Sequence, residues 1–233
     1  MNRAIDAVII DLDGTMVDTM GDFVAALNLM LADLPLPDIR VSPLDAAVVN
    51  DMIGKGSEHL VKSVLNHVQD QMQLAGKAVD LLGHYGLAFA RYQAHYATVN
   101  GQHSEVYPDV LEGLTKLRRI GLPLVCLTNK PVVFARALLA LKGLVGFFET
   151  VFGGDSFERK KPDPLPLLKA CAFLKTLPAR TLMVGDSSND AKAGRAAGCP
   201  VLLVTYGYNH GEPVNSVDAD GFIDSLTQVH WPR

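Results

Sequence analysis

Short β-type runs alternate with amphipathic helical runs from Pro108 to the end of the chain. This order is typical of a parallel sheet whose strands are joined by crossover helices. An earlier apolar run, Ile5–Ile10, fits a buried strand of the same sheet. The later strands are expected at Leu122–Leu127, Thr150–Phe152, Thr181–Val184, Val201–Thr205 and Gly221–Ile223. The pattern predicts an α/β fold with a doubly wound, Rossmann-like parallel sheet.

The stretch 15–104 has a different pattern, with helical periodicity throughout and no convincing strand. One apolar face consists of Phe23, Ala26, Leu27, Met30, Leu31 and Leu34, and another of Leu60, Val64 and Val68. We therefore expect a helical cap domain at 15–104, inserted into a core domain made of residues 1–14 and 105–233. Such an insertion would lie above the carboxyl ends of the strands, where open α/β sheets bind ligands.

Composition excludes several classes of partner. The 233 residues are 48% hydrophobic, which is enough for a sizeable core. A formal net charge of −4 disfavours a broad basic surface for nucleic acid or anionic membranes. No apolar stretch reaches the ~20 residues that a membrane span needs. We expect a cytoplasmic protein, a monomer or homodimer, whose three cysteines are reduced core residues.

Two carboxylates follow the first strand directly. Asp11 and Asp13 are separated by one residue, so their side chains can converge at the carboxyl edge of the sheet. Like charges at that distance are costly unless they share a proton or bind a divalent cation, and carboxylate and carbonyl oxygens suit Mg²⁺. Gly14 permits a backbone conformation closed to most residues and exposes N–H groups to an anion.

Three further strand ends carry polar residues. Thr128 and Asn129 offer a hydroxyl and main-chain donors that suit phosphate oxygens. The segment with Lys160 and Lys161 offers an ammonium group that could neutralise a bound anion, and Asp186 and Asp190 place two more carboxylates at a helix start. Because parallel strands end at one edge of the sheet, we expect these groups to share a site.

The segments DLDGT, LTN, KKPDP and GDSSND occur in this order, each at a strand end. Together they resemble the motifs of the haloacid dehalogenase superfamily of aspartyl phosphotransferases, and the resemblance covers nearly the whole chain. The stretch from Met52 to Ser57, with the segments DPLPLL and NDAKAGRAAG, is similar to the phosphoglycolate phosphatase branch.

This resemblance implies roles for the acids and the lysine. Asp11 would attack phosphorus and become an aspartyl-phosphate, while Asp13 would protonate the leaving group and then activate water. Mg²⁺ would be held by a side-chain oxygen of Asp11, the backbone carbonyl of Asp13 and the side chain of Asp186. Asp190 would orient metal-bound water or Lys161, and Lys161 would help to neutralise the reacting anions.

The resemblance also implies how the substrate is held. Thr128 and the amides of Leu12, Asp13 and Asn129 would surround the phosphoryl oxygens. In the cap, Gly54 and Lys55 would touch substrate, with Lys55 able to meet a second anionic group such as a carboxylate. The alternative is a flexible connection between helices.

Some polar residues receive no catalytic role at this point. Lys160 fits a solvated surface charge, and the stretch with Tyr206, Tyr208 and His210 fits a polar loop. For Asp11 and Asp13 the alternative is a turn that caps nearby N–H groups.

The predicted function is Mg²⁺-dependent hydrolysis of a small phosphorylated metabolite, with 2-phosphoglycolate as the first candidate. The presence of Asp13 favours phosphate chemistry over dehalogenation, since a halide leaving group needs no proton and superfamily dehalogenases typically lack that acid. Two alternatives remain open. One is a sugar phosphomutase of the same superfamily, similar to β-phosphoglucomutase, and the other is a non-catalytic protein that binds a phosphometabolite on the same fold.

Overall fold

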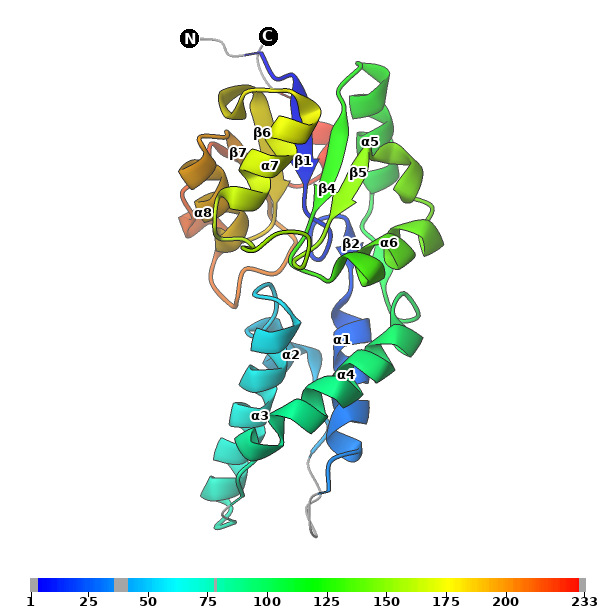
Figure 1. Cartoon of the computed structure of the whole chain (residues 1–233). Coiled ribbons are helices and arrows are strands. Elements are labelled where there is room, and N and C mark those ends of the chain that lie inside the picture. The colour runs from blue at the N-terminus through cyan, green and yellow to red at the C-terminus, as the bar shows by residue number, and fades with distance from the viewer. Residues whose placement is uncertain (1–3, 36–41, 78, 231–233) are drawn as a thin grey trace.

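The computed structural model describes residues 4–35, 42–77 and 79–230. Its central element is a six-stranded sheet, all parallel, with strand order β5-β4-β1-β6-β7-β8 (Figure 1). The strands of this sheet are β1 (Ala7–Ile10), β4 (Leu124–Leu127), β5 (Thr150–Phe152), β6 (Thr181–Gly185), β7 (Val201–Val204) and β8 (Gly221–Ile223). The predicted doubly wound sheet is confirmed.

Strand β1 lies at the centre of the sheet, with β4 on one side and β6 on the other. Ile10 is opposite Cys126 of β4 and opposite Val184 of β6. The chain builds the sheet outward from β1 in one direction through β4 and β5, and in the other through β6, β7 and β8. The winding therefore reverses at β1, and a doubly wound sheet binds its ligand at the carboxyl ends of the strands beside such a reversal.

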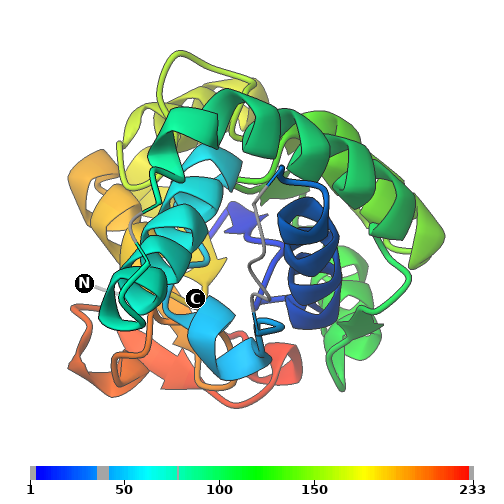
Figure 2. The same ribbon diagram turned by 90° about the horizontal axis from the view of Figure 1, so that it is seen from below.

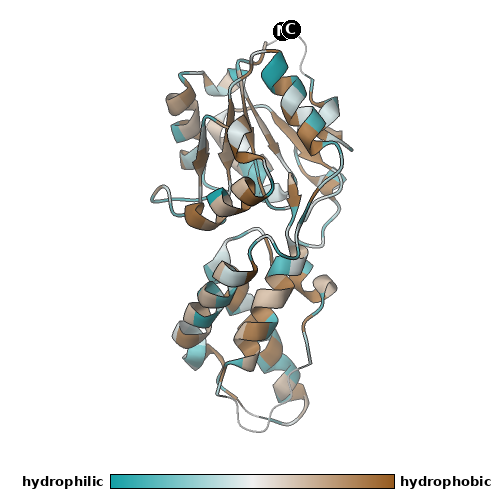
Figure 3. Ribbon diagram, turned by 90° about the vertical axis from the view of Figure 1, so that its right-hand side faces the viewer, coloured by the Kyte–Doolittle hydropathy of each residue, from teal (hydrophilic) through white to brown (hydrophobic). Residues whose placement is uncertain are grey.

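Alternate residues of the strands face opposite layers of helices. Val8 and Ile10 belong to the hydrophobic cluster formed with α5 and α6, whereas Ile9 belongs to the cluster formed with α7 and α8. The helices are α5 (Val110–Arg119), α6 (Val132–Leu141), α7 (Leu165–Leu174) and α8 (Ser188–Ala197). Figures 1 and 3 show these two layers and the hydrophobic residues that run along the strands between them. Such strands, buried on both faces, produce the continuous apolar runs seen in the sequence.

A bundle of helices lies beyond the carboxyl edge of the sheet (Figure 1). It consists of α1 (Met20–Ala32), α2 (Ala46–Asn50), α3 (Ser57–Leu74) and α4 (Tyr85–Val99). Helix α4 packs against both α1 and α3, which lie on opposite sides of the bundle (Figure 2). The bundle has its own hydrophobic cluster, which includes Leu27, Val64 and Tyr92. Among the described residues, no helix is long and apolar enough to cross a membrane.

A short antiparallel ribbon joins the helical bundle to the sheet. Strand β2 (Val17–Asp18) pairs with β3 (Glu105–Val106), with Val17 opposite Val106. The sequence predicts no strand within 15–104, so β2 corrects that expectation. Two residues are too few to produce a recognisable alternation of apolar and polar side chains.

Candidate active site

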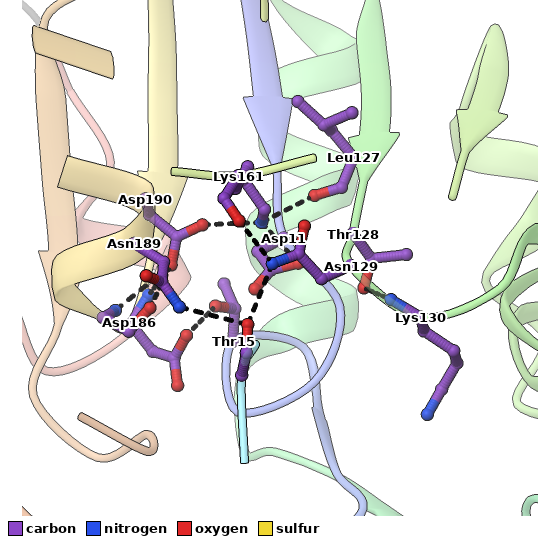
Figure 4. Close-up of polar contacts among 12 residues, drawn as sticks. Asp11, Thr15, Leu127, Thr128, Asn129, Lys130, Lys161, Asp186, Asn189 and Asp190 are labelled. Carbon is purple, nitrogen blue, oxygen red and sulfur yellow. Dashed lines mark hydrogen bonds and ion pairs between the residues drawn. The ribbon is translucent and has the colours of Figure 1, made fainter. Parts of the chain in front are cut away.

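Three buried aspartates meet where β1 and β6 end. Asp11 follows β1, Asp186 follows β6, and Asp190 lies in the first turn of α8. Each contributes a carboxylate oxygen, and these oxygens lie within 4.8 Å of one another (Figure 4). The sequence predicts this grouping because neighbouring parallel strands deliver their last residues to the same edge.

Two glycines make room for the aspartates. Gly14 has a φ of +80°, and a Cβ there would lie 2.1 Å from Oδ2 of Asp186. A Cβ at Gly185 would lie 2.3 Å from Cγ of Asp190. Both distances are far below a van der Waals contact, so the chain requires glycine here for space, and at Gly14 also for its left-handed conformation.

Asp190 is held by the start of its own helix. Its Oδ2 accepts a hydrogen bond from the Ser187 hydroxyl at 2.8 Å and one from the Ser187 amide at 3.2 Å. Its Oδ1 lies 2.6 Å from Nζ of Lys161. Since both oxygens already have partners, Asp190 is suited to positioning Lys161, which is one of the two roles that the resemblance implies for it.

Lys161 lies between two of the aspartates, and its ammonium group has three protein partners. Nζ lies 2.9 Å from Oδ1 of Asp11 and 2.6 Å from Oδ1 of Asp190, and it donates to the Leu127 carbonyl at 2.9 Å. Burial alone lowers the pKa of Lys161, but the two carboxylates outweigh it and the net shift is upward. Lys161 is therefore a fixed positive charge beside Asp11.

One ammonium group does not balance three carboxylates. Burial raises the pKa of Asp11 to about 7, and the charges of Asp190 and Asp13 add to this against the opposing effect of Lys161. Burial also raises the pKa of Asp186 well above its ordinary value, with Asp190 and Asp11 contributing. A further cation would relieve this repulsion.

The residues present fit Mg²⁺. The donor set is carboxylate oxygen, which that ion prefers. Although Oδ1 of Asp11 is close to Lys161, it is buried and accepts no hydrogen bond of good geometry among the described residues. The group of candidate side chains includes Asp11, Asp186 and Asp190. Asp13 is outside this group, which is compatible with the predicted use of its backbone carbonyl alone.

The predicted phosphate-binding residues surround the same edge. Thr128 is buried, and its Oγ1 accepts from the Lys130 amide at 3.1 Å. The Asn129 side chain donates to the carbonyl of Lys161 at 2.8 Å. The side chain of Leu12 is fully buried in the core, so only its backbone can contact a ligand.

A cavity of about 40 Å³ lies between the sheet edge and the helical bundle. From the sheet side it is lined by Asp11, Asp13, Thr128, Asn129, Lys130, Lys161 and Asp186, and from the bundle by Phe23, Ile53, Gly54, Leu60, Tyr92 and Tyr96. Because a buried water needs roughly 10–15 Å³, this space suits a small ligand.

Residues 5–198 match the family model described as "Hydrolase: haloacid dehalogenase-like hydrolase". The chain belongs to the haloacid dehalogenase-like hydrolase family. The resemblance seen in the four motifs is thereby confirmed, and the aspartate cluster described above consists of residues from two of them, DLDGT and GDSSND.

Curated relatives of this hydrolase match it over almost its whole length. It is 41% identical to a phosphoglycolate phosphatase of Thiobacillus denitrificans, over 97% of this chain and 94% of the relative. It is 45% identical to a plasmid phosphoglycolate phosphatase of Cupriavidus necator, over 94% of this chain and 89% of the relative. The crystal structure of a predicted phosphoglycolate phosphatase from Haemophilus somnus 129PT superposes with a TM-score of 0.86 at 29% identity, covering 96% of this chain and 95% of that one.

The hydrolase places Asp13 apart from the other acids, toward the bundle. Its Oδ1 accepts from the Thr19 hydroxyl at 2.8 Å and lies 2.8 Å from Nζ of Lys130. Lys130 is a buried site residue that sequence reasoning missed. The signal was available, because Lys130 directly follows the LTN segment.

The bundle contacts the sheet edge through Gly54. Its carbonyl accepts hydrogen bonds from the side-chain amides of Asn129 at 2.9 Å and Asn189 at 3.1 Å. Lys55, by contrast, is exposed and is not among the residues that line the cavity. Lys160, expected to be a solvated charge, pairs with Glu58 of α3 at 2.8 Å.

Tyr208 is a second site residue for which the sequence predicts no role. Its amide donates to Oδ2 of Asp186 at 2.6 Å. Its hydroxyl accepts from the amides of Thr19 at 2.9 Å and Met20 at 3.1 Å and donates to Asp18. Tyr208 therefore connects the aspartate cluster, through its backbone amide, to the first turn of α1, through its side-chain hydroxyl.

Proposed function

We propose that this hydrolase is a Mg²⁺-dependent phosphomonoesterase that converts 2-phosphoglycolate to glycolate and inorganic phosphate. The observation that carries the proposal is the placement of Asp11, which is buried beside Lys161 and faces a small cavity. The names of the relatives support the choice of substrate. A cytoplasmic location and a monomeric or homodimeric state are part of the proposal.

In the first step, an oxygen of Asp11 attacks phosphorus in line with the ester bond. The P–O ester bond breaks, and an aspartyl-phosphate forms on Asp11. Asp13 gives its proton to the departing alkoxide. The positive charge of Lys161 reduces the repulsion between the attacking carboxylate and the phosphoryl group.

In the second step, Asp13 accepts a proton from water as the water oxygen attacks phosphorus. The bond between phosphorus and Asp11 breaks, which releases inorganic phosphate and restores both acids. Thr128 and the amides of Leu12, Asp13 and Asn129 hold the phosphoryl oxygens in both steps. Their shared place at the sheet edge supports this role.

Mg²⁺ would be held by the side chains of Asp11 and Asp186 and the backbone carbonyl of Asp13, with Asp190 keeping Lys161 in position. When bound, the ion supplies positive charge that stabilises the phosphoryl oxygens in the transition state.

Residues 15–104 would act as a cap over a core of 1–14 and 105–233. The contacts of Gly54 with Asn129 and Asn189 support this, because they link the bundle directly to the catalytic edge. A cap that excludes water protects the aspartyl-phosphate until the hydrolytic water is in position.

The direct test is phosphate release from 2-phosphoglycolate by the purified protein with Mg²⁺, measured beside a panel of phosphate esters that includes β-glucose 1-phosphate. We expect kcat/KM to be highest for 2-phosphoglycolate. Isomerisation of the sugar phosphate without net phosphate release would instead indicate a mutase. Binding without turnover across the panel would indicate a non-catalytic protein.

The effect of Mg²⁺ on stability should depend on pH. The pKa of Asp11 is raised from 3.8 to about 7, so the folded metal-free protein keeps a proton that the unfolded chain loses. Its stability should therefore fall as pH rises from about 4 to 7. Mg²⁺ competes with that proton and should stabilise the protein more at pH 8 than at pH 5.

At about 100 times its Kd, Mg²⁺ should contribute about 2.7 kcal/mol at pH 8. For a chain of this size that corresponds to a rise in Tm of about 5–10 °C. Thermal unfolding with Mg²⁺ or with a chelator at both pH values measures the difference. Equal shifts at the two pH values would contradict the assignment of Asp11 as a ligand.

A further inference from the structure

The cavity has two cationic side chains among the described residues that line it, Lys130 and Lys161. They differ in how fully their donors are used. Lys161 has three protein partners close to Nζ: it donates to Asp190 and to the Leu127 carbonyl, and it forms an ion pair with Asp11. Lys161 is therefore held by protein groups on three sides and acts on a ligand through its charge.

Lys130 has an unused donor. Nζ lies 2.8 Å from Oδ1 of Asp13 and donates to the Tyr96 hydroxyl at 2.6 Å. An ammonium group has three N–H donors, and no described residue accepts the third. The side chain is only 3% exposed, so bulk water does not readily provide the missing acceptor.

Aromatic rings from the bundle surround this ammonium group. Nζ lies 4.6 Å from the ring centre of Phe23 on α1 and 4.8 Å from that of Tyr96 on α4. Ring faces attract a cation without neutralising its charge. In low-dielectric surroundings of this kind, an anion that reaches Lys130 is bound more strongly than in water.

Tyr96 offers a second donor at the same place. Its hydroxyl oxygen accepts from Lys130, so its own hydrogen stays available, and no described contact uses it. Burial raises the pKa of Tyr96 well above its ordinary value, with the charges of Asp13 and Asp22 adding to this, so the phenol keeps its hydrogen. An ammonium N–H and a phenol O–H thus lie side by side at the cavity.

We propose that Lys130 and Tyr96 form a subsite for the carboxylate of the substrate, on the bundle side of the phosphate position. This inference rests on the proposed function, because 2-phosphoglycolate carries one phosphate and one carboxylate. Lys130 is two residues from Thr128, so the two anionic ends of the ligand would be close together, as they are in a two-carbon acid. Figure 4 shows the Lys130 side chain extending away from Asp186 and Asp190.

The subsite gives Lys130 the role that the sequence suggested for Lys55. Lys55 is exposed and does not line the cavity. Lys130 comes from the loop after β4, whereas Tyr96 comes from α4. A carboxylate bound to both would connect the sheet to the bundle, so substrates with that group would favour the closed arrangement of the two parts.

The test compares 2-phosphoglycolate with ethyl phosphate, which has the same two-carbon ester but no carboxylate. We expect Lys130→Met to lower the ratio of their kcat/KM values by about 100-fold, the loss typical of removing one partner from a buried charge pair. Tyr96→Phe should lower it by about tenfold, as expected for one hydrogen bond to a charged group. Lys130→Arg keeps the charge and should retain most of the preference. Lys169→Met, which removes an exposed charge on α7, should leave both substrates unaffected.

Thermal unfolding of each variant separates a substrate-specific effect from a folding defect. The ratio of the kcat/KM values for the two substrates is also independent of the fraction of protein that is folded. An unchanged ratio in Lys130→Met would overturn the inference, as would a lowered ratio in Lys55→Met without one in Lys130→Met. If the wild-type protein released no phosphate from 2-phosphoglycolate, the proposed function itself would fall, and the subsite with it.

Discussion

Replacing Asp11 with asparagine is expected to lower kcat for phosphate release from 2-phosphoglycolate by at least about 10⁴-fold. The amide is not a competent nucleophile toward phosphorus, so no aspartyl-phosphate forms. The fold should persist, because Asp11 is buried and its pKa is already raised to about 7. A neutral side chain of the same shape removes a charge that the folded protein holds at a cost. We expect Tm to fall by no more than a few degrees.

The matched control is Asp6→Asn, which removes a partly exposed carboxylate at the other end of the same strand. Asp6 pairs with Arg180 on the surface, far from the catalytic edge. Its kcat should equal that of the wild type. Steady-state phosphate release and mass spectrometry of the acid-quenched enzyme measure turnover and the phosphorylated intermediate. Comparable release by Asp11→Asn and the wild type would refute the covalent mechanism.

Lys161→Met is expected to reduce both activity and stability. Without its ammonium group, Asp11 and Asp190 remain buried near each other with no cation between them. Removing one partner from a buried charge group costs about 3–5 kcal/mol, which corresponds to a fall in Tm of roughly 10 °C or more. Loss of the positive charge beside the attacking carboxylate should lower kcat by about 10³-fold.

The neighbouring residue provides a close control. Lys160 also pairs with a carboxylate, that of Glu58, but its side chain is 35% exposed and that of Glu58 57% exposed. An exposed pair of this kind contributes less than about 1 kcal/mol. Lys160→Met should therefore retain its Tm within a few degrees and most of its kcat. Equal losses of Tm and kcat in Lys160→Met and Lys161→Met would show that the burial of Lys161 contributes nothing to stability or turnover.

The sheet was predictable because each strand leaves a local signal. Strand β5 begins and ends where the apolar pattern places it, at Thr150–Phe152. Strand β4 begins two residues later than expected, at Leu124. The residue before it is Pro123, which has no N–H for a ladder but whose carbonyl still accepts from the Val8 amide at 3.1 Å.

The acid cluster was also predictable, for a topological reason. Asp11 and Asp186 each follow a strand, and adjacent parallel strands end at the same edge of the sheet. No side-chain detail is needed for that inference. Their raised pKa values then follow from burying like charges together.

The contacts between bundle and sheet were not predictable in the same way. Lys130 meets Tyr96, 34 residues away in the chain, and Tyr208 meets Thr19, which is 189 residues away. Such pairs depend on how the helical bundle packs against the carboxyl edge of the sheet. Lys55 was a candidate for a second anion because the stretch from Met52 to Ser57 resembles the phosphoglycolate phosphatase branch. It lies between two glycines, and a flexible backbone does not determine where a side chain points.

The ribbon formed by β2 and β3 has a consequence for how such a chain evolves. Both connections to the helical bundle pass through two adjacent, hydrogen-bonded segments, with Asp18 opposite Glu105. The chain between β2 and β3 therefore begins and ends at this ribbon. It can be exchanged for another insertion without altering the strand order of the sheet or displacing Asp11. New specificities are thereby open to recombination, while the strands that carry the aspartate cluster stay in place.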